Sequence, residues 1–350
     1  MVVAYLNSNQ VDASKAIHKE LAKNACFSPP NTWEPRFTPR QEIFLIGCGS
    51  LPLLEQLLCR EGARLFADPS LSSDGAVSCA SCHPTAGPGT TLPPTPVLSD
   101  GLARPQSRGL SLKSPRTPSL LDVGRSPGPF FWNGRSRQLE DQAYWPLYSR
   151  FEMDSSAERL QRHGGSRFVA LALAAFVRSL QSGPAPFDDW LREDCSALNQ
   201  QEQEGAFLVL EQKSCIVCHQ GSELRGSAVV RMRYFTVPKD LLQADEAGYA
   251  PDAELSIFWL GKQARVLHSV PQSLRNLRLR NQVFGRFGQS ADLRSFLQDH
   301  GRQPQDPMLR YQLAQRELQS ILAFLEKALS SPSIETMNPF AQESFTPAMW

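Results

Sequence analysis

The residue types best suited to chemistry gather in two pentapeptides, Cys79–His83 (CASCH) and Cys215–His219 (CIVCH). Two thiols three residues apart can add to the two vinyl groups of one porphyrin, and the histidine that follows is placed to ligate the iron. A zinc site that pools the four thiols is the alternative, but it would use neither histidine. Two complete copies therefore predict two covalently attached c-type haems. The attachment and ligand residues would be Cys79, Cys82, His83, Cys215, Cys218 and His219.

The composition is that of an ordered protein with long loops. The chain has 350 residues, a net charge of +1 and 41% hydrophobic residues, together with 27 prolines and 22 glycines. This length predicts two domains, each large enough to bury a core. Because the charge is balanced and no apolar run is long enough to span a bilayer, we expect neither nucleic-acid binding nor an integral membrane protein.

Haem attachment points to the periplasm, because covalent c-type haem is normally made outside the cytoplasm. The first residues, Met1–Leu6, lack the basic n-region of a signal peptide. Leu45–Cys48 resembles a lipoprotein cleavage box, but the apolar run before it is too short to insert, so we interpret it as coincidence. The periplasmic assignment therefore rests on haem chemistry alone.

The elements that must position these motifs are mainly helical. Apolar residues recur at helical spacing over 51–66, 155–180, 199–212 and 312–329. The first of these helices leads toward CASCH and the third runs into CIVCH. Residues 84–118 are rich in Pro, Gly, Ser and Thr and predict a long functional loop. Strand patterns are scarce, with 232–237 the best candidate, so the predicted class is mainly α.

Several further segments resemble bacterial dihaem cytochrome c peroxidases and the methylamine utilisation protein MauG. They are Leu65–Ser72, Arg116–Leu121, Phe131–Arg135, Leu139–Ala143, Ser182–Asp188 and Ser273–Asn276. The resemblance covers roughly residues 51–329 and implies two all-α cytochrome c domains with one haem each. The expected divisions are an N-terminal extension over 1–50, a peroxidatic domain over 51–190, an electron-transfer domain over 191–330 and a tail over 331–350.

The resemblance also assigns roles around the first haem. It makes His83 the proximal ligand of a peroxide-reactive iron and Trp132 the tryptophan that transfers holes between the haems. Gln142 and Glu152 match a distal pair, in which the carboxylate moves a proton between the peroxide oxygens and the amide positions them. Pro146 matches a small apolar wall over the same haem face.

The long predicted loop bears on the sixth coordination position of that haem. Related peroxidases that need reductive activation carry a histidine in this loop, and it blocks the iron at rest. Residues 84–118 contain none of the six histidines of this chain. We therefore expect the iron of the first haem to be open without activation.

The second haem is expected to have two histidine ligands. His219 would be proximal, and placing the family's distal helix on Leu293–Leu297 puts His300 where peroxidases supply methionine and MauG supplies tyrosine. Such a haem has a lower potential than a His/Met haem. Gly285–Gly288 replaces the family's His-Asp-Gly and can shift this register. The alternative ligands are then Met308, Tyr311 and His268.

Two smaller features concern calcium and the remaining thiols. The family binds calcium partly through an asparagine, and Arg116 stands in its place. A guanidinium cannot ligate a cation, so either the calcium site is lost or the arginine charge substitutes for the ion. The other cysteines could form disulfides in an oxidising compartment. They are Cys26, Cys48, Cys59 and Cys195.

The function expected from this resemblance is that of a dihaem oxidoreductase that uses hydrogen peroxide. The first hypothesis is MauG-like, long-range oxidation of a residue on a partner protein. The second is peroxide clearance with electrons from a small cytochrome c or cupredoxin, which predicts ligation of the second haem by Met308. The third is a non-enzymatic dihaem electron carrier in which both irons are six-coordinate.

Overall fold

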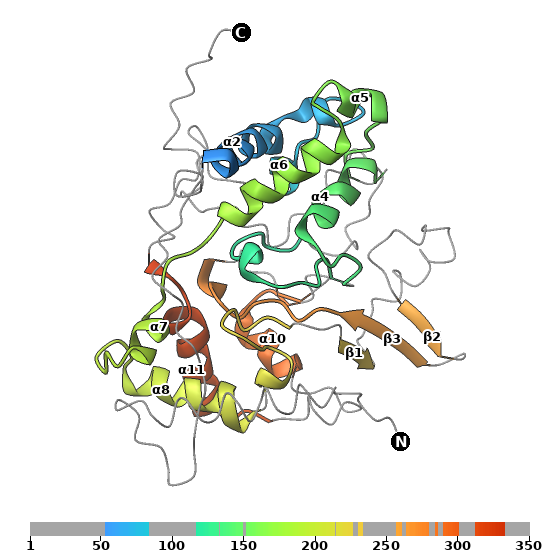
Figure 1. Ribbon diagram of the computed structural model, residues 1–350. Coiled ribbons are helices and arrows are strands. Elements are labelled where there is room, and N and C mark those ends of the chain that lie inside the picture. Colours follow the sequence, from blue (N-terminus) through green and yellow to red (C-terminus); the bar gives the residue numbers. More distant parts are fainter. Residues whose placement is uncertain are drawn as a thin grey trace.

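The computed structural model is mostly helical, and its helices form two groups (Figure 1). The described residues are 53–83, 117–132, 134–149, 152–213, 215–226, 230–233, 257–260, 264–279, 284–285, 290–300 and 312–332. The expected extension at 1–50, nearly all of the loop expected at 84–118 and the tail beyond residue 332 lie outside these ranges.

The N-terminal group of helices surrounds a first hydrophobic core. Its members are α2 (Leu53–Ala67), α3 (Cys79–Cys82), α4 (Leu139–Tyr148), α5 (Ala157–Gln161) and α6 (Ser166–Ser179). Helices α2 and α4 both lie against α6. The side chains of Leu173 and Phe176 in α6 are almost fully buried in this core. The first four residues of CASCH form α3, which contacts α2 of this helical group.

The C-terminal group surrounds a second core. Its members are α7 (Pro186–Leu191), α8 (Gln200–Phe207), α10 (Leu293–His300) and α11 (Gln315–Ala323). Helices α8 and α11 pack together, and each continues into a π-helical turn, at Leu208–Gln212 and Phe324–Ala328. Phe187 and Trp190 of α7 stack at 6.0 Å between ring centroids and belong to this second core.

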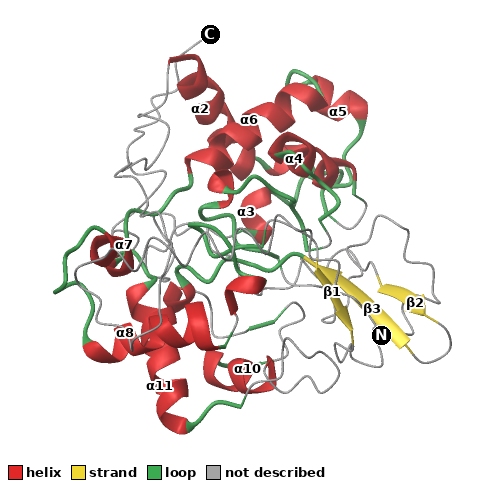
Figure 2. Ribbon diagram, turned by 60° about the horizontal axis from the view of Figure 1, so that its bottom comes forward, coloured by secondary structure: helices red, strands yellow, loops and turns green. Residues whose placement is uncertain are grey.

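A small antiparallel sheet lies beside the two helical groups (Figure 2). Its strands are β1 (Val230–Arg233), β2 (Ile257–Leu260) and β3 (Ala264–Ser269), in the order β1-β3-β2. Arg231 pairs with His268, and Phe258 pairs with Val266. The expected strand at 232–237 overlaps β1, whereas β2 and β3 were not predicted because their short runs do not alternate clearly. Strand β3 leads directly into the segment that contacts the second haem motif.

Two sequence predictions needed correction in detail. The helix expected over 155–180 is divided into α5 and α6, because Gly164 and Gly165 adopt φ values of 91° and 90° that a helix cannot contain. In α2 the predicted helix is present, but Leu54 and Leu57 are 72% and 56% exposed. The face that α2 buries instead includes Cys59.

Each core contains one very close helix crossing at a glycine. A Cβ atom on Gly62 of α2 would overlap the carbonyl oxygen of Ala172 in α6. A Cβ atom on Gly205 of α8 would overlap the carbonyl oxygen of Ser320 in α11 in the same way. Both helix pairs therefore meet backbone to backbone, which only glycine permits.

Asp122 and Asn276 occupy equivalent places in the two halves, 154 residues apart. Each has a φ of 60°, in the left-handed region. The backbone N–H of Asp122 donates to the carbonyl of Leu180 at 2.8 Å, and that of Asn276 donates to Leu329 at 3.0 Å. In both halves the same kind of residue therefore anchors the end of the last helical segment.

The side chains of Asp122 and Asn276 accept equivalent hydrogen bonds in the two halves, and they also bond to each other. The backbone N–H of Ser182 donates to Asp122 Oδ1 at 2.8 Å, and that of Ser331 donates to Asn276 Oδ1 at 2.9 Å. Asn276 Nδ2 then donates to Asp122 Oδ2 at 3.0 Å and to Ser182 Oγ at 3.1 Å. All four residues are buried, so this network is an interior joint between the halves.

The helices of the described part of the chain include no candidate for a membrane span. Within the described ranges, none combines the length and the apolar character that crossing a bilayer requires.

A buried ion pair fixes α7 to the segment that follows β3. Arg275 donates through Nη1 and Nη2 to the two carboxylate oxygens of Asp188, at 2.8 and 2.7 Å, and its Nε donates to the carbonyl of Ser222 at 2.6 Å. The side chains of Arg275 and Asp188 are 1% and 0% exposed. Because both charges are out of water, removing one leaves the other uncompensated.

We expect Asp188→Ala to lower the free energy of unfolding by about 3–5 kcal/mol, because it strands the Arg275 guanidinium in the interior. The matched control is Asp189→Ala. Asp189 is 47% exposed and pairs with Arg192, so its loss should cost less than about 1 kcal/mol. Denaturant titration of both variants makes the comparison, and equal losses would contradict the assignment.

Candidate functional site

Both haem motifs fold into a single tight turn. The backbone N–H of His83 donates to the carbonyl of Cys79 at 2.8 Å, and that of His219 donates to Cys215 at 2.9 Å. Residues at positions i, i+3 and i+4 of such a turn share one face. Each motif can therefore present its two thiols and its imidazole to the same planar group.

The thiols of the two motifs are in the state that haem attachment requires. None of the four is in a disulfide, whereas Cys59 and Cys195 are disulfide-bonded. Burial, with the charge of the second thiol, raises the pKa of Cys79 and of Cys215 to about 12. Cys79 packs against the first core and Cys215 against the second. Among the described residues, no three metal-ligating side chains converge, and the residues present fit two separate haems.

His219 is oriented by two carbonyl oxygens. Its Nδ1 lies 2.8 Å from the carbonyl oxygen of Gln272 and 3.2 Å from that of Leu224. Since a carbonyl only accepts, Nδ1 carries the proton and Nε2 keeps its lone pair for a metal. This is the arrangement expected of a proximal haem ligand.

His83 lies against the first core. Its ring centroid is 6.2 Å from that of Phe66 in α2. Burial lowers the pKa of His83 to about 3, so the imidazole is neutral near pH 7, which is the form that can ligate iron.

The predicted distal residues of the first haem gather on α4 and in the turn that follows it. Gln142 and Pro146 lie one turn apart on α4, where Pro146 has no N–H to donate to the carbonyl of Gln142. The chain then folds back, and the N–H of Met153 donates to the carbonyl of Pro146 at 3.1 Å. Glu152 thus lies beside the end of α4. After burial and the second thiol, its charge also raises the pKa of Cys79, which places the carboxylate near the first motif.

Trp132 lies where the N-terminal and C-terminal halves of the molecule contact each other, a boundary that we call the seam. Its carbonyl accepts the N–H of Val270 at 2.8 Å, and Val270 is fully buried. Val270 directly follows β3 and precedes Gln272, whose carbonyl holds His219. The predicted inter-haem tryptophan is therefore bonded to the segment that supports the second motif.

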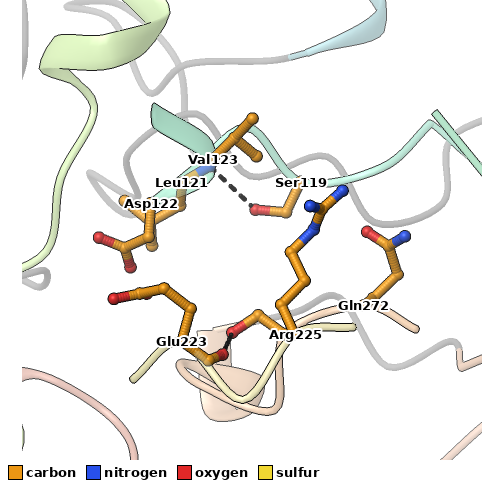
Figure 3. Close-up of a pocket in the computed structure, with 8 residues that line it drawn as sticks. Ser119, Leu121, Asp122, Val123, Glu223, Arg225 and Gln272 are labelled. Carbon is orange, nitrogen blue, oxygen red and sulfur yellow. Dashed lines mark hydrogen bonds between the residues drawn. The ribbon is translucent and has the colours of Figure 1, made fainter. Parts of the chain in front are cut away.

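A small cavity of about 20 Å³ lies in the same seam (Figure 3). It is lined on one side by Asp122 and on the other by Glu223, Arg225 and Gln272. Its volume suits a single water molecule. Burial lowers the pKa of Arg225 to about 10, so the guanidinium that borders this cavity stays charged near pH 7.

The internal repeat relates His300 to the distal side of the first haem. Isolated β-bridges join the ends of Phe130–Ser136 and of Phe284–Ser290, and these segments have the same 154-residue separation as Asp122 and Asn276. That separation takes Pro146 of α4 to His300, the last residue of α10. Burial lowers the pKa of His300 to about 4. A neutral imidazole thus stands where the first half has a proline.

Some candidate residues have no assigned role in the structure, and two residues of the site were not predicted from the sequence. His268 stands in β3 opposite Arg231. Arg225 and Val270 were missed, because no local pattern marks a contact across the seam. Of the residues named in the sequence predictions, those that lie outside the described ranges are Cys26, Cys48, Arg116, Met308 and Tyr311.

Comparison with known proteins identifies relatives over most of the chain. A family model described as Di-haem cytochrome c peroxidase matches residues 59–196. The chain is 30% identical over 302 residues to the methylamine utilization protein MauG of Methylorubrum extorquens, which covers 79% of each protein. It is 28% identical over 288 residues to cytochrome c551 peroxidase of Pseudomonas aeruginosa, which covers 75% of this chain and 76% of the relative.

Solved structures share the fold. A MauG-like protein associated with microbial copper homeostasis has a TM-score of 0.54 at 19% identity, covering 90% of this chain and 98% of that one. The diheme peroxidase BthA from Burkholderia thailandensis has a TM-score of 0.53 at 18% identity, covering 81% and 88%. The identity to MauG over most of both chains settles the relationship: the chain belongs to the dihaem cytochrome c peroxidase and MauG family of peroxidase-type oxidoreductases.

Proposed function

We propose that this oxidoreductase takes up hydrogen peroxide at the first haem and passes oxidising equivalents through Trp132 and the second haem to a partner protein, as a MauG-like enzyme of the periplasm. One haem would be held by each of two cytochrome c domains, expected over 51–190 and 191–330, and α7, which spans the expected boundary, packs in the second core. The observation that carries the proposal is the turn after α4, in which the N–H of Met153 bonds to the carbonyl of Pro146 and brings Glu152 beside Pro146.

Each haem would be attached through both thiols of its motif, with His83 or His219 as the proximal ligand. When bound, haem supplies the cleavage of the peroxide O–O bond and holds oxidising equivalents until an electron donor is reached. The two hydrogen bonds on Nδ1 of His219 support this ligation, since they fix the tautomer in which Nε2 is unprotonated.

The residues beside the first motif would handle the protons. The Glu152 carboxylate accepts the proton of the nearer peroxide oxygen and returns it to the departing one, which leaves as water. The amide of Gln142 donates a hydrogen bond that orients the peroxide, and Pro146 limits the entry of water. The histidine-free stretch at 84–118 supports an open coordination position on this side.

The second haem would be closed by His300. The internal repeat supports this, because it places the imidazole at the end of α10 where the first half has Pro146. Two histidine ligands lower the potential relative to His/Met ligation. A lower potential makes this haem a poorer acceptor from a small cytochrome and favours its own oxidised states. The calcium ion of related proteins is not part of this proposal.

Peroxide clearance is the second candidate function. The similarity to cytochrome c551 peroxidase over 75% of this chain favours it. The electron donor would be a small cytochrome c or cupredoxin, and the second haem would need a higher-potential ligand such as Met308. The axial ligand of the second haem therefore separates the two functions.

We expect Glu152→Gln to slow the reaction with peroxide by roughly 10²–10⁴-fold, the usual contribution of a positioned proton carrier. Haem content should not change. Glu158→Gln is the control, because this exposed carboxylate lies on α5 in the same part of the chain. Stopped-flow absorbance at the Soret band measures the rate, and wild-type kinetics in the Glu152 variant would refute the proton-transfer role.

Electron paramagnetic resonance of the oxidised protein should show one high-spin and one low-spin ferric haem. His300→Ala should alter the low-spin signal alone, because it removes the sixth ligand of the second haem. His163→Ala is the control, since His163 contacts Ser70 at the surface of the first half. An unchanged low-spin signal in the His300 variant would exclude this ligand, and two low-spin signals in the wild type would exclude an open first haem.

A further inference from the structure

The backbone around His219 reaches across the seam at two places. The first begins at Leu224, whose carbonyl oxygen lies 3.2 Å from His219 Nδ1. The next residue, Arg225, donates through Nη1 to Ser126 Oγ at 2.6 Å and through Nη2 to the carbonyl of Pro129 at 3.0 Å. Leu224, which supports the imidazole, is therefore followed directly by Arg225, whose side chain bonds to the segment that leads to Trp132.

The second connection begins at Gln272, whose carbonyl oxygen lies 2.8 Å from the same His219 nitrogen. Two residues earlier, the N–H of Val270 donates to the carbonyl of Trp132 at 2.8 Å. The side-chain amide of Gln272 closes this short segment by donating to the carbonyl of Val270 at 3.0 Å. A continuous route of covalent and hydrogen bonds thus joins Trp132 to the second proximal ligand.

The two connections also contact each other. The N–H of Gly226 donates to the carbonyl of Pro271 at 3.0 Å. A Cβ atom at position 226 would overlap the Pro271 ring, so only glycine allows this approach. The segments 224–226 and 270–272 therefore behave as one unit, which we call the clasp.

Arg225 brings a charge into this unit. The residue is 9% exposed, and its two acceptors are a hydroxyl and a carbonyl oxygen. Within the described ranges it forms no ion pair with a carboxylate, although Asp122 and Glu223 line the same cavity (Figure 3). A buried cation beside the support of a haem ligand disfavours the more positive, oxidised state of that haem.

We propose that Arg225 is a positioning residue for electron transfer: the clasp fixes Trp132 relative to His219, and the guanidinium charge raises the potential of the second haem. The inference rests on the proposed role of Trp132. For each peroxide reduced to two waters, two electrons would leave the partner protein and pass through the second haem and Trp132 to the first haem. The two protons required come from solvent.

Arg225→Met, Arg225→Lys, Arg159→Met and Trp132→Phe test this proposal in the full-length dihaem protein. Arg159 is the matched control, because it donates to the carbonyls of Ser70 and Ser73 within the first half, not across the seam. Two quantities are measured: the potential of the second haem by spectroelectrochemistry, and the rate at which peroxide oxidises that haem after reduction, by stopped flow.

Arg225→Met should lower the potential and slow the oxidation roughly tenfold to hundredfold, as expected for a small displacement of the transfer partners. Arg225→Lys should restore the potential but not the rate, because an ammonium lacks the planar fork. If Arg225→Met does not retain both haems, Arg225→Lys alone tests the proposal. It should keep the wild-type potential of the second haem while its oxidation is slowed. Arg159→Met should match the wild type in both quantities.

The outcomes separate this inference from the function on which it rests. Wild-type oxidation in Trp132→Phe would overturn the role of Trp132 itself. A slow Trp132→Phe with a normal rate in both Arg225 variants would overturn the clasp alone. Equal slowing of haem oxidation in Arg159→Met would mean that losing any arginine of this kind slows the reaction, which would overturn the clasp. An unchanged potential in Arg225→Met would overturn the effect of the Arg225 charge on the second haem.

Discussion

The hydrogen bond between the Asn276 amide and the Asp122 carboxylate is the contact on which the arrangement of the two halves depends. Each partner already anchors the end of its own half, through Leu329 or Leu180. The bond between them therefore joins the ends of the two units at a buried point. Because a buried carboxylate that loses a donor bears the full desolvation penalty, this joint resists sliding as well as separation. The seam that contains Trp132 inherits its geometry from this constraint.

The sequence was informative where the determining interactions are local. The haem motifs, α2 and the α8 region follow from residue spacing and helical periodicity, which neighbouring residues impose on one another. The seam could not be predicted, because Arg225 and its acceptors are about a hundred residues apart. Part of it was nevertheless visible, since Ser119–Asp122 (SLLD) and Ser273–Asn276 (SLRN) are versions of one tetrapeptide. Only the structure reveals that the last residues of these two copies bond to each other.

The two halves share one helical arrangement but differ in the residue at one corresponding position. Pro146 and His300 stand at corresponding places on α4 and α10. A proline offers neither a proton nor a ligand, whereas a neutral imidazole offers a lone pair. The two halves therefore differ, at this shared position, in whether the side chain can ligate a metal. The different roles proposed for the two haems therefore require no difference in fold, only a different residue at a shared position.

The close crossings at Gly62 and Gly205 have a consequence for how such a chain can arise. In each half, the helix that precedes the haem motif touches the helix that ends the unit, backbone against backbone. The entrance and exit of each unit are therefore neighbours in space. Units whose ends meet can be copied in tandem without disturbing either interior, because the new connection has only a short gap to cross. A gene that encoded one such unit could double by simple repetition, and its copies could then diverge.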